Sequence, residues 1–229
     1  MDISIRLKTI ASMVDKCEVL VDVGTDHAYI PIYLVENHIC QRAIASDINK
    51  GPVEKAKLNV AMEGLKEKIQ CRLGGGFSTI EPAEADVAVI AGMGGNLIRD
   101  IILEREEVFK NLQYAVLQPV QNPEVLREFI YKKGYEILDE ELCLEDEKYY
   151  QIMKVKFNNK PINIKDIYYE VGQKLIEKKH PLLKNFLMHL VNKYKRILNS
   201  IKDDTDLAKK RKIEISHKLK ELEELISCL

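Results

Sequence analysis

The stretch VLVDVGTDHAYIPI, residues Val19–Ile32, changes character in its middle. Its first part is a short apolar, β-branched run, which is typical of a strand buried in a parallel sheet. The run ends at Gly24, and a helical pattern begins near Ala28. A glycine loop at this position lets backbone N–H groups and a helix start approach the polar part of a ligand. The stretch therefore predicts the first strand, the ligand loop and the first helix of an α/β fold.

The same alternation continues through two thirds of the chain. We expect further strands at residues 42–48, 68–74, 86–92 and 114–120, with helices between them at 32–38, 53–64, 97–108 and 124–133. Such a series predicts a doubly wound parallel sheet. After Gly134 come two strand-like stretches with no helix between them, which predict a final antiparallel hairpin. This ending is the layout of class I methyltransferases, whereas NAD-binding Rossmann domains continue with parallel strands.

A second, helical part is predicted beyond the linker NNKP, Asn158–Pro161. We expect a first helix at residues 164–179, stopped by Pro181. Two apolar stripes with heptad spacing follow, separated by the polar stretch KDDTD, and predict an antiparallel coiled-coil pair. The stripes comprise Leu183, Leu187, Leu190, Tyr194, Ile197 and Ile201, then Ile215, Leu219, Leu222, Ile226 and Leu229. The predicted domains are thus residues 1–160 and residues 161–229.

Charge is distributed unevenly between these two parts. The net formal charge is −1, but residues 1–160 hold 20 Lys and Arg against 26 Asp and Glu, and residues 161–229 hold 15 against 10. A basic appendage on an acidic domain is suited to binding nucleic acid, although charge alone is also explained by a solvated helical surface.

Composition excludes several classes of protein. No apolar run approaches the ~18 residues of a membrane span, and the N-terminus does not resemble a signal peptide, so we expect a cytoplasmic protein without a membrane partner. The five cysteines lie far apart, which fits free thiols. No CxxC or HExxH motif is present, so no metal is expected.

Three more strand ends carry candidate ligand contacts. Asp47, at the tip of the second strand, is placed to accept hydrogen bonds from ribose hydroxyls, with a helix cap as its alternative. The motif AGMGG, Ala91–Gly95, gives the fourth strand a wall almost free of side chains, or else a flexible turn. Gln118 follows the fifth strand and is suited to a base edge, although a buried glutamine that ties down a loop is commoner.

Polar and aromatic side chains are concentrated in the first loop, at Asp26, His27 and Tyr29. His27 is a candidate base, but a single histidine more often caps a helix or fills a core. No Ser/His/Asp or Cys/His pair stands out for nucleophilic catalysis. Transfer of an already activated methyl group needs alignment and exclusion of water more than a nucleophilic residue.

Several motifs in order resemble one known family. They are DVGTDHAYIPI, ASDINKGP, VIAGMGG, LQP with Leu126 and Arg127, and EDEKYY. Together with Arg6 and the helical extension, they resemble the bacterial tRNA adenine-N1 methyltransferases that modify adenine 22 in the D-arm. The resemblance covers nearly the whole chain and implies a class I methyltransferase fold, S-adenosylmethionine as cofactor and tRNA as substrate.

The resemblance also implies a role for individual positions. Gly24 and its neighbours would hold the methionine part of the cofactor, Asp47 its ribose, and Asp26 and His27 would lie between cofactor and base. The implied catalytic residues are Asp26, His27 and Gln118; the implied cofactor contacts are Asp22, Gly24, Asp26, His27, Tyr29, Asp47, Gly74, Gly92 and Met93; and the implied substrate contacts are Arg6, Tyr29, Gly94, Gly95, Lys193 and Arg196. One departure concerns the residue after RLG, which in such proteins is usually acidic and able to contact the cofactor adenine. This chain has Gly75 there, so adenine recognition must rely on other groups.

Two other classes of function remain as alternatives. A NAD-dependent oxidoreductase is opposed by the incomplete glycine fingerprint and by the antiparallel ending of the sheet. A non-catalytic RNA-binding or assembly protein would use the helical pair as its working surface.

Overall fold

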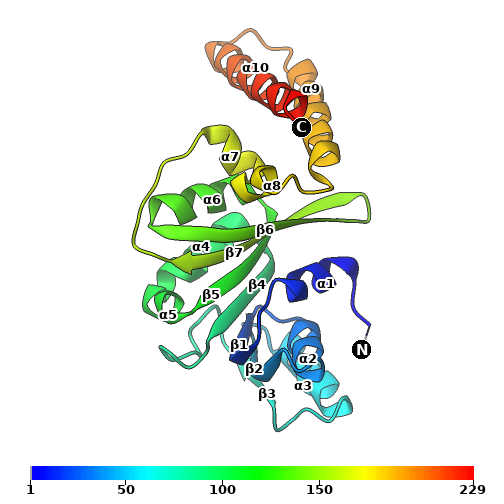
Figure 1. Ribbon diagram of the computed structural model, residues 1–229, viewed down its shortest axis with the longest axis vertical. Helices are drawn as coiled ribbons and strands as arrows, with labels where there is room; N and C mark the ends of the chain where they lie inside the picture. Colours follow the sequence, from blue (N-terminus) through cyan, green and yellow to red (C-terminus); the bar gives the residue numbers. More distant parts are fainter. Residues whose placement is uncertain (1) are drawn as a thin grey trace. The chain divides into compact units, whose positions relative to one another are not determined.

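The computed structural model describes residues 2–229. These residues form two compact units, and the boundary between them along the chain lies between Asn163 and Ile164. The first unit is built on one mixed sheet of seven strands in the order β3-β2-β1-β4-β5-β7-β6 (Figure 1). The parallel strands are β1 (Cys17–Val23), β2 (Cys40–Asp47), β3 (Ile69–Leu73), β4 (Val87–Gly94) and β5 (Tyr114–Gln121). The antiparallel hairpin consists of β6 (Tyr135–Glu145) and β7 (Lys148–Phe157).

Burial on both faces explains why the central strands are so apolar. Residues Leu20, Val89 and Val116, on β1, β4 and β5, are fully buried. Helices α1 (Ile5–Ser12), α2 (Tyr29–Glu36) and α3 (Lys50–Met62) lie on one face. On the other lie α4 (Gly95–Glu104), α5 (Glu106–Asn111) and α6 (Pro123–Lys132) (Figure 1). The chain reverses its winding between β3 and β4, so β1 and β4 are neighbours and their loops open a crevice at the carboxyl edge.

Three expected elements differ from the observed ones in more than a small shift of both ends. The helix expected at residues 97–108 is two helices, because the backbone of Arg105 leaves the helical region at φ −133° and ψ 56°. The helix expected at residues 164–179 is also two, separated by Gly172 at φ 95°. The fourth strand, expected to end at Gly92, continues to Gly94 through two register shifts against β5.

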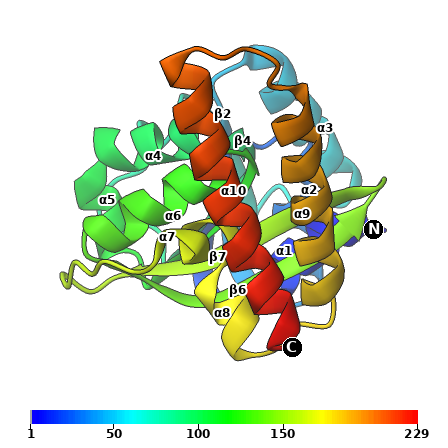
Figure 2. The same cartoon turned by 90° about the horizontal axis from the view of Figure 1, so that it is seen from above.

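The second unit, Ile164–Leu229, contains α7 (Asp166–Val171), α8 (Gln173–Glu177), α9 (Leu183–Ser200) and α10 (Asp206–Ser227). Helices α9 and α10 lie side by side and are joined by five residues, so they run antiparallel (Figure 2). Leu187 and Leu190 of the first apolar stripe and Ile215 and Leu222 of the second are buried. Among residues 2–229, no helix is both long and apolar enough to cross a membrane.

Candidate active site

The loop after β1 is held in one shape by its own backbone. Gly24 has φ 78°, and the N–H groups of Gly24 and Thr25 both donate to the carbonyl oxygen of Ser46, each at 2.8 Å. The Thr25 hydroxyl accepts from the N–H of Ala28 at 3.1 Å, and Ala28 itself lies in the left-handed region at φ 56°. A buried alanine in this conformation costs ~1–3 kcal/mol, and such strain is concentrated at functional sites.

Asp26, His27 and Tyr29 project from this loop. The imidazole of His27 lies parallel to the Tyr29 ring, with centroids 5.0 Å apart, and its Nε2 is 3.4 Å from Oδ2 of Asp26. Asn59 of α3 donates to the His27 carbonyl at 3.0 Å, which ties the loop to the next helix. The N–H groups of Asp26 and His27 have no acceptor among residues 2–229, so they are available to a ligand. The loop thus offers two backbone donors, a carboxylate and an aromatic platform.

A hollow of about 350 Å³ opens beside the tips of β1, β2 and β4. Its walls are mostly glycine and apolar side chains, and Ile48 and Leu97 are unusually exposed for apolar residues, at 70% and 51%. Exposed apolar side chains around a side-chain-free floor suit a flat, apolar ring. The lining comprises Gly24, Asp47, Ile48, Gly74, Gly75, Gly76, Ser78, Met93, Leu97, Ile101 and Glu104.

Asp47 supplies a carboxylate to this hollow. Its Oδ1 accepts from the N–H of Asn49 at 2.7 Å, which fixes the turn that leads into α3. Its Oδ2 has no protein partner among residues 2–229 and can accept from a ligand hydroxyl. The ligand role and the turn-forming role expected as alternatives are therefore compatible in one side chain.

A second hollow, of about 450 Å³, lies between the β1 loop, α1 and the end of β6. Gly24 lines both hollows, and a Cβ on Gly24 would lie 1.9 Å from Cε of Met93. The flexible Met93 side chain could move away from such a Cβ, so it is the backbone conformation, φ 78°, that favours glycine here. The lining comprises Ser4, Arg6, Leu7, Asp22, Gly24, Thr25, Asp26, His27, Tyr29, Ile30, Ala91, Gly92 and Glu145.

Asp22 is the buried acid of this second hollow. It is only 6% exposed, and burial raises its pKa to about 6, although a hydrogen bond with Thr25 opposes the shift. Ionised Asp22 lacks a cation among residues 2–229, so its charge favours a positively charged ligand group, such as an ammonium.

Arg6 of α1 closes one side of the second hollow. Its Nη1 donates to Oε1 of Gln118 at 2.8 Å, and its guanidinium carbon lies 5.4 Å from the centre of the Tyr150 ring. Its backbone N–H donates to Oε1 of Glu145 at 3.0 Å. This hydrogen bond lowers the pKa of Glu145, which is therefore ionised at neutral pH.

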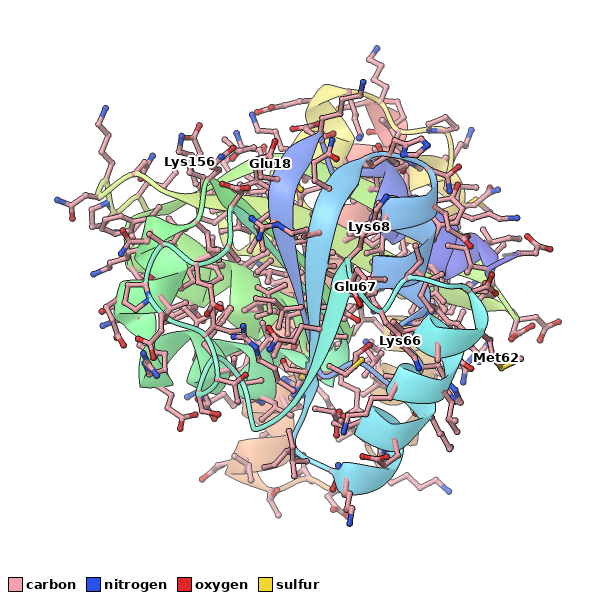
Figure 3. The ribbon with its side chains drawn as sticks, turned by 90° about the horizontal axis from the view of Figure 1, so that it is seen from below. Glu18, Met62, Lys66, Glu67, Lys68 and Lys156 are labelled. Carbon is pink, nitrogen blue, oxygen red and sulfur yellow. The ribbon has the colours of Figure 1, made fainter. Side chains whose placement is uncertain are left out.

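Another hollow, of about 550 Å³, lies at the free edge of the sheet near the amino ends of β2 and β3. Figure 3 shows Lys66, Glu67 and Lys68 together in the turn that leads into β3. The lining of this hollow contains both basic and acidic side chains, and Arg72 and Glu84 form an ion pair in its wall. Within residues 2–229, no three His, Cys, Asp or Glu side chains are grouped as metal ligands.

Comparisons with known proteins identify the family. A sequence model of tRNA (adenine(22)-N(1))-methyltransferases matches residues 20–224. The chain belongs to this family. The tRNA (adenine(22)-N(1))-methyltransferase of Bacillus subtilis is 33% identical over 98% of this chain and 97% of its own length.

Solved structures of similar proteins include complexes with the cofactor and its product. A Streptococcus pneumoniae protein in complex with S-adenosyl-L-methionine is 31% identical, with a TM-score of 0.87 over 98% of this chain and 100% of that chain. The M. capricolum protein TrmK in complex with S-adenosyl-homocysteine is 27% identical, with a TM-score of 0.84 over 98% of both chains. The Rossmann-like methyltransferase fold and S-adenosylmethionine as cofactor are thereby confirmed.

The structure brings most of the expected site residues of this methyltransferase into the two hollows. Asp22, Asp26, His27, Tyr29, Gly92 and Arg6 line the second hollow; Asp47, Gly74 and Met93 line the first; and Gly24 lines both. Gly92 has φ 79°, a conformation that favours glycine.

Other expected residues lie elsewhere. Gln118 is fully buried, and its amide is engaged at both ends, by Arg6 and by the Pro119 carbonyl, so it does not face a ligand. Gly95 is buried where a Cβ would lie 2.3 Å from the Asn122 carbonyl oxygen, which is a packing requirement. Gly94 faces open space outside both linings. Lys193 and Arg196 belong to α9 of the second unit.

Several lining residues were not identified as candidates from the sequence. Ile48, Leu97, Ser78 and Glu104 line the first hollow, and Glu145 lines the second. Ile48 was expected as the last residue of the second strand; it becomes a usable signal only if that strand ends at Asp47, because an apolar side chain then stands in a polar loop. Glu145 gave no such signal, because it reaches the site only through the fold of the hairpin.

Proposed function

We infer that this chain transfers the methyl group of S-adenosylmethionine to N1 of adenine 22 in tRNA, in the cytoplasm. The observation that carries the inference is the pair of hollows that meet at Gly24, one suited to an adenosyl group and the other open to a substrate base. The family match over residues 20–224 fixes the reaction class.

The described residues fit the cofactor. Asp47 would accept from the ribose hydroxyls, and the apolar side chains of Ile48 and Leu97 would hold the adenine ring. Asp22 balances the ammonium of the methionine part, and the free N–H groups of Asp26 and His27 donate to its carboxylate. With Gly75 in place of an acidic residue, Ser78 and Glu104 are the remaining polar side chains in the hollow for the adenine amino group. Calorimetry with S-adenosylmethionine on Ser78→Ala and Glu104→Gln separates these two candidates.

The substrate base occupies the second hollow. Because N1 lies on the Watson–Crick edge of adenine, the base must be unpaired or turned out of its stack, at a cost of a few kcal/mol. Tyr29, 39% exposed and supported by the parallel His27 ring, gives the base a stacking surface. Such stacking is worth ~1–3 kcal/mol and offsets part of that cost.

Methyl transfer requires the protein to align the base with the methyl group and to place negative charge near the base. Bound S-adenosylmethionine supplies a methyl group on a sulfonium, and neutral adenine has a free lone pair on N1, so no prior deprotonation is required. Positive charge then develops on the base, and the carboxylate of Asp26 stabilises it. The hydrogen bonds from the Ala28 N–H to Thr25 and from Asn59 to the His27 carbonyl hold this loop in place before the reaction.

A substitution of Asp26 tests whether its carboxylate acts in the reaction or in tRNA binding. We expect Asp26→Ala to lower kcat by ~10²-fold, because a stabilising charge near the base is lost, while the Kd for tRNA rises less than threefold. Single-turnover methylation and tRNA binding measure the two effects on the same protein. Equal losses in both would make Asp26 a structural loop residue, and Asp2→Ala, a change at an exposed acid on the N-terminal segment, is the control.

The second unit binds the tRNA in this proposal. Residues 161–229 form a domain apart from the methyltransferase domain, residues 1–160, and α9 and α10 act as an antiparallel coiled coil. The central parts of the two heptad stripes support this, because Leu187, Leu190, Ile215 and Leu222 are buried and α9 contacts α10. Lys193 and Arg196 are exposed on α9 and are suited to tRNA phosphates.

One experiment tests the function as a whole. Unmodified tRNA incubated with the protein and labelled S-adenosylmethionine should gain 1-methyladenosine, with mass spectrometry placing it at position 22. No label in any RNA would favour a non-catalytic RNA-binding protein, and calorimetric binding of NAD without binding of S-adenosylmethionine would favour an oxidoreductase.

A further inference from the structure

The guanidinium of Arg6 is fixed from several sides. Gln118 accepts from its Nη1, the Tyr150 ring lies beside it, and Oε2 of Glu145 is 3.9 Å from its Nε. An arginine tethered in this way has already lost much of the rotamer entropy that binding a ligand would cost.

Part of this guanidinium is still unused. Within residues 2–229, no protein group accepts from Nη2 of Arg6, although Arg6 lines the second hollow and its side chain is only 25% exposed. Arg6 is also the sole Lys or Arg in that lining, which includes the carboxylates of Asp22, Asp26 and Glu145. The donors of Arg6 therefore define the place in the hollow where an anion, and not a cation, is stabilised.

The chemistry of the reaction decides which anion this is. Methylation places positive charge on the base, so a guanidinium in contact with the base would oppose the reaction. The phosphodiester beside the target nucleotide carries a full negative charge and matches the planar fork of arginine. We propose that Arg6 binds this backbone phosphate, and that Gln118 is a positioning residue that acts through Arg6 and does not touch the base. The proposal rests on tRNA as substrate of the second hollow.

Salt dependence tests the phosphate contact. Replacing one phosphate-binding cation reduces the slope of log Kd against log salt concentration by ~0.7–1. We expect Arg6→Gln to reduce the slope for unmodified tRNA by this amount between roughly 50 and 200 mM salt. Arg42→Gln, a change at an exposed arginine at the amino end of β2, should leave the slope unchanged. An unchanged slope in Arg6→Gln would overturn the proposal.

A double-mutant cycle tests the role of Gln118. Gln118→Met removes the acceptor but keeps the volume, and we expect kcat/KM for tRNA to fall ~10-fold while the Kd for S-adenosylmethionine stays within ~2-fold. Since Gln118 acts only through Arg6, the double variant Arg6→Gln/Gln118→Met should be no worse than Arg6→Gln alone. Losses that multiply would show that Gln118 acts on its own, and the proposal would fall.

Gln118→Glu keeps the test valid if Gln118→Met folds poorly. It retains an acceptor for Nη1, so it should keep the salt slope and recover most of the activity lost in Gln118→Met. Loss of the slope in Gln118→Glu, with an unchanged thermal midpoint, would contradict positioning by this hydrogen bond. Binding slopes are read without catalysis, so a wild-type protein that binds tRNA but forms no 1-methyladenosine refutes the proposed function separately.

Discussion

Asp22 is a buried acid whose ionisation carries a free-energy cost until a cation binds. Its pKa is raised to about 6 by burial. The cofactor ammonium stays protonated below pH ~7, so within this proposed ion pair the charge that changes between pH 5 and pH 7 is that of Asp22. We expect the Kd for S-adenosylmethionine to rise ~10-fold as the pH falls from 7 to 5, measured by calorimetry in the absence of tRNA.

Asp22→Asn is the control for this pH dependence. It should bind the cofactor weakly at every pH, with a Kd that changes little from pH 5 to 7. The same shift acts on stability: between about 3.8 and about 6 the folded state binds more protons than the unfolded state. The free energy of unfolding of the free protein therefore falls as pH rises through this window, and Asp22→Asn should remove the fall. A pH-independent wild-type Kd would contradict the role of Asp22.

Single residues were predictable from the sequence where strand ends fix their position. Gly24 and Asp47 follow the first two strands, and parallel strands bring such ends to one edge. Gln118 also follows a strand, but its burial and its hydrogen bond to Arg6 depend on α1 packing against a segment more than a hundred residues away. Sequence position alone therefore placed Gln118 near the site but could not show what it faces.

At the level of elements, Glu170 joins three helices of the second unit. The Tyr194 hydroxyl and Lys218 Nζ, the latter at 2.9 Å, both donate to its carboxylate, and these interactions hold its pKa below the usual value against the effect of burial. We expect Glu170→Gln to destabilise the second unit by ~1–3 kcal/mol at pH 7, because a charge-assisted hydrogen bond to buried groups is weakened. Hydrogen exchange of the α7, α9 and α10 amides measures the loss within this unit.

The sign of the pH dependence follows from the lowered pKa. The contribution of Glu170 is present above its unfolded pKa and is lost as pH falls through the folded value, so wild type and Glu170→Gln should converge in acid. Glu177→Gln is the matched control, since its pair with Lys174 is exposed and worth little. A difference that persists unchanged in acid would show that packing, and not charge, explains the loss.

Periodicity predicted the strands and long helices well, because burial on a face is repeated along each element. It did not predict the two helix breaks, because the conformation of a single residue ends the helix at each of them. Gly172 at φ 95° ends α7 without disturbing the apolar spacing on either side. Arg105 lacks the conformational freedom of glycine. The break between α4 and α5 at this residue follows from tertiary packing, which a local sequence pattern does not encode.

At the scale of the whole molecule, the proposed chemistry and the proposed tRNA binding belong to parts of the chain with opposite net charge. The acidic first part holds the carboxylates proposed to stabilise a cation, whereas residues 161–229 carry the excess of Lys and Arg. A polyanion repelled by the first part and attracted by the second would be bound mainly through the second. The asymmetry was visible in the sequence, but which cations are free of partners required the structure.

Among the cations of the second unit that have no carboxylate partner within residues 2–229, three lie exposed on α9 and α10: Lys184, Arg196 and Lys210. We expect the triple change to Gln to raise the Kd for tRNA by ~10²-fold at 100 mM salt, roughly the loss of three phosphate contacts, and to reduce the salt slope by ~2–3. The Kd for S-adenosylmethionine and kcat at saturating tRNA should stay unchanged, because no residue of the two hollows is altered.

A triple change of the paired lysines Lys195, Lys209 and Lys220 is the matched control. It removes the same charge from the same unit, but each lysine already neutralises a carboxylate, so the Kd for tRNA should rise far less. If both triples weaken binding equally, net charge alone attracts the tRNA. If neither does, the second unit takes no part in recognition, and the phosphate contacts must come from the methyltransferase domain.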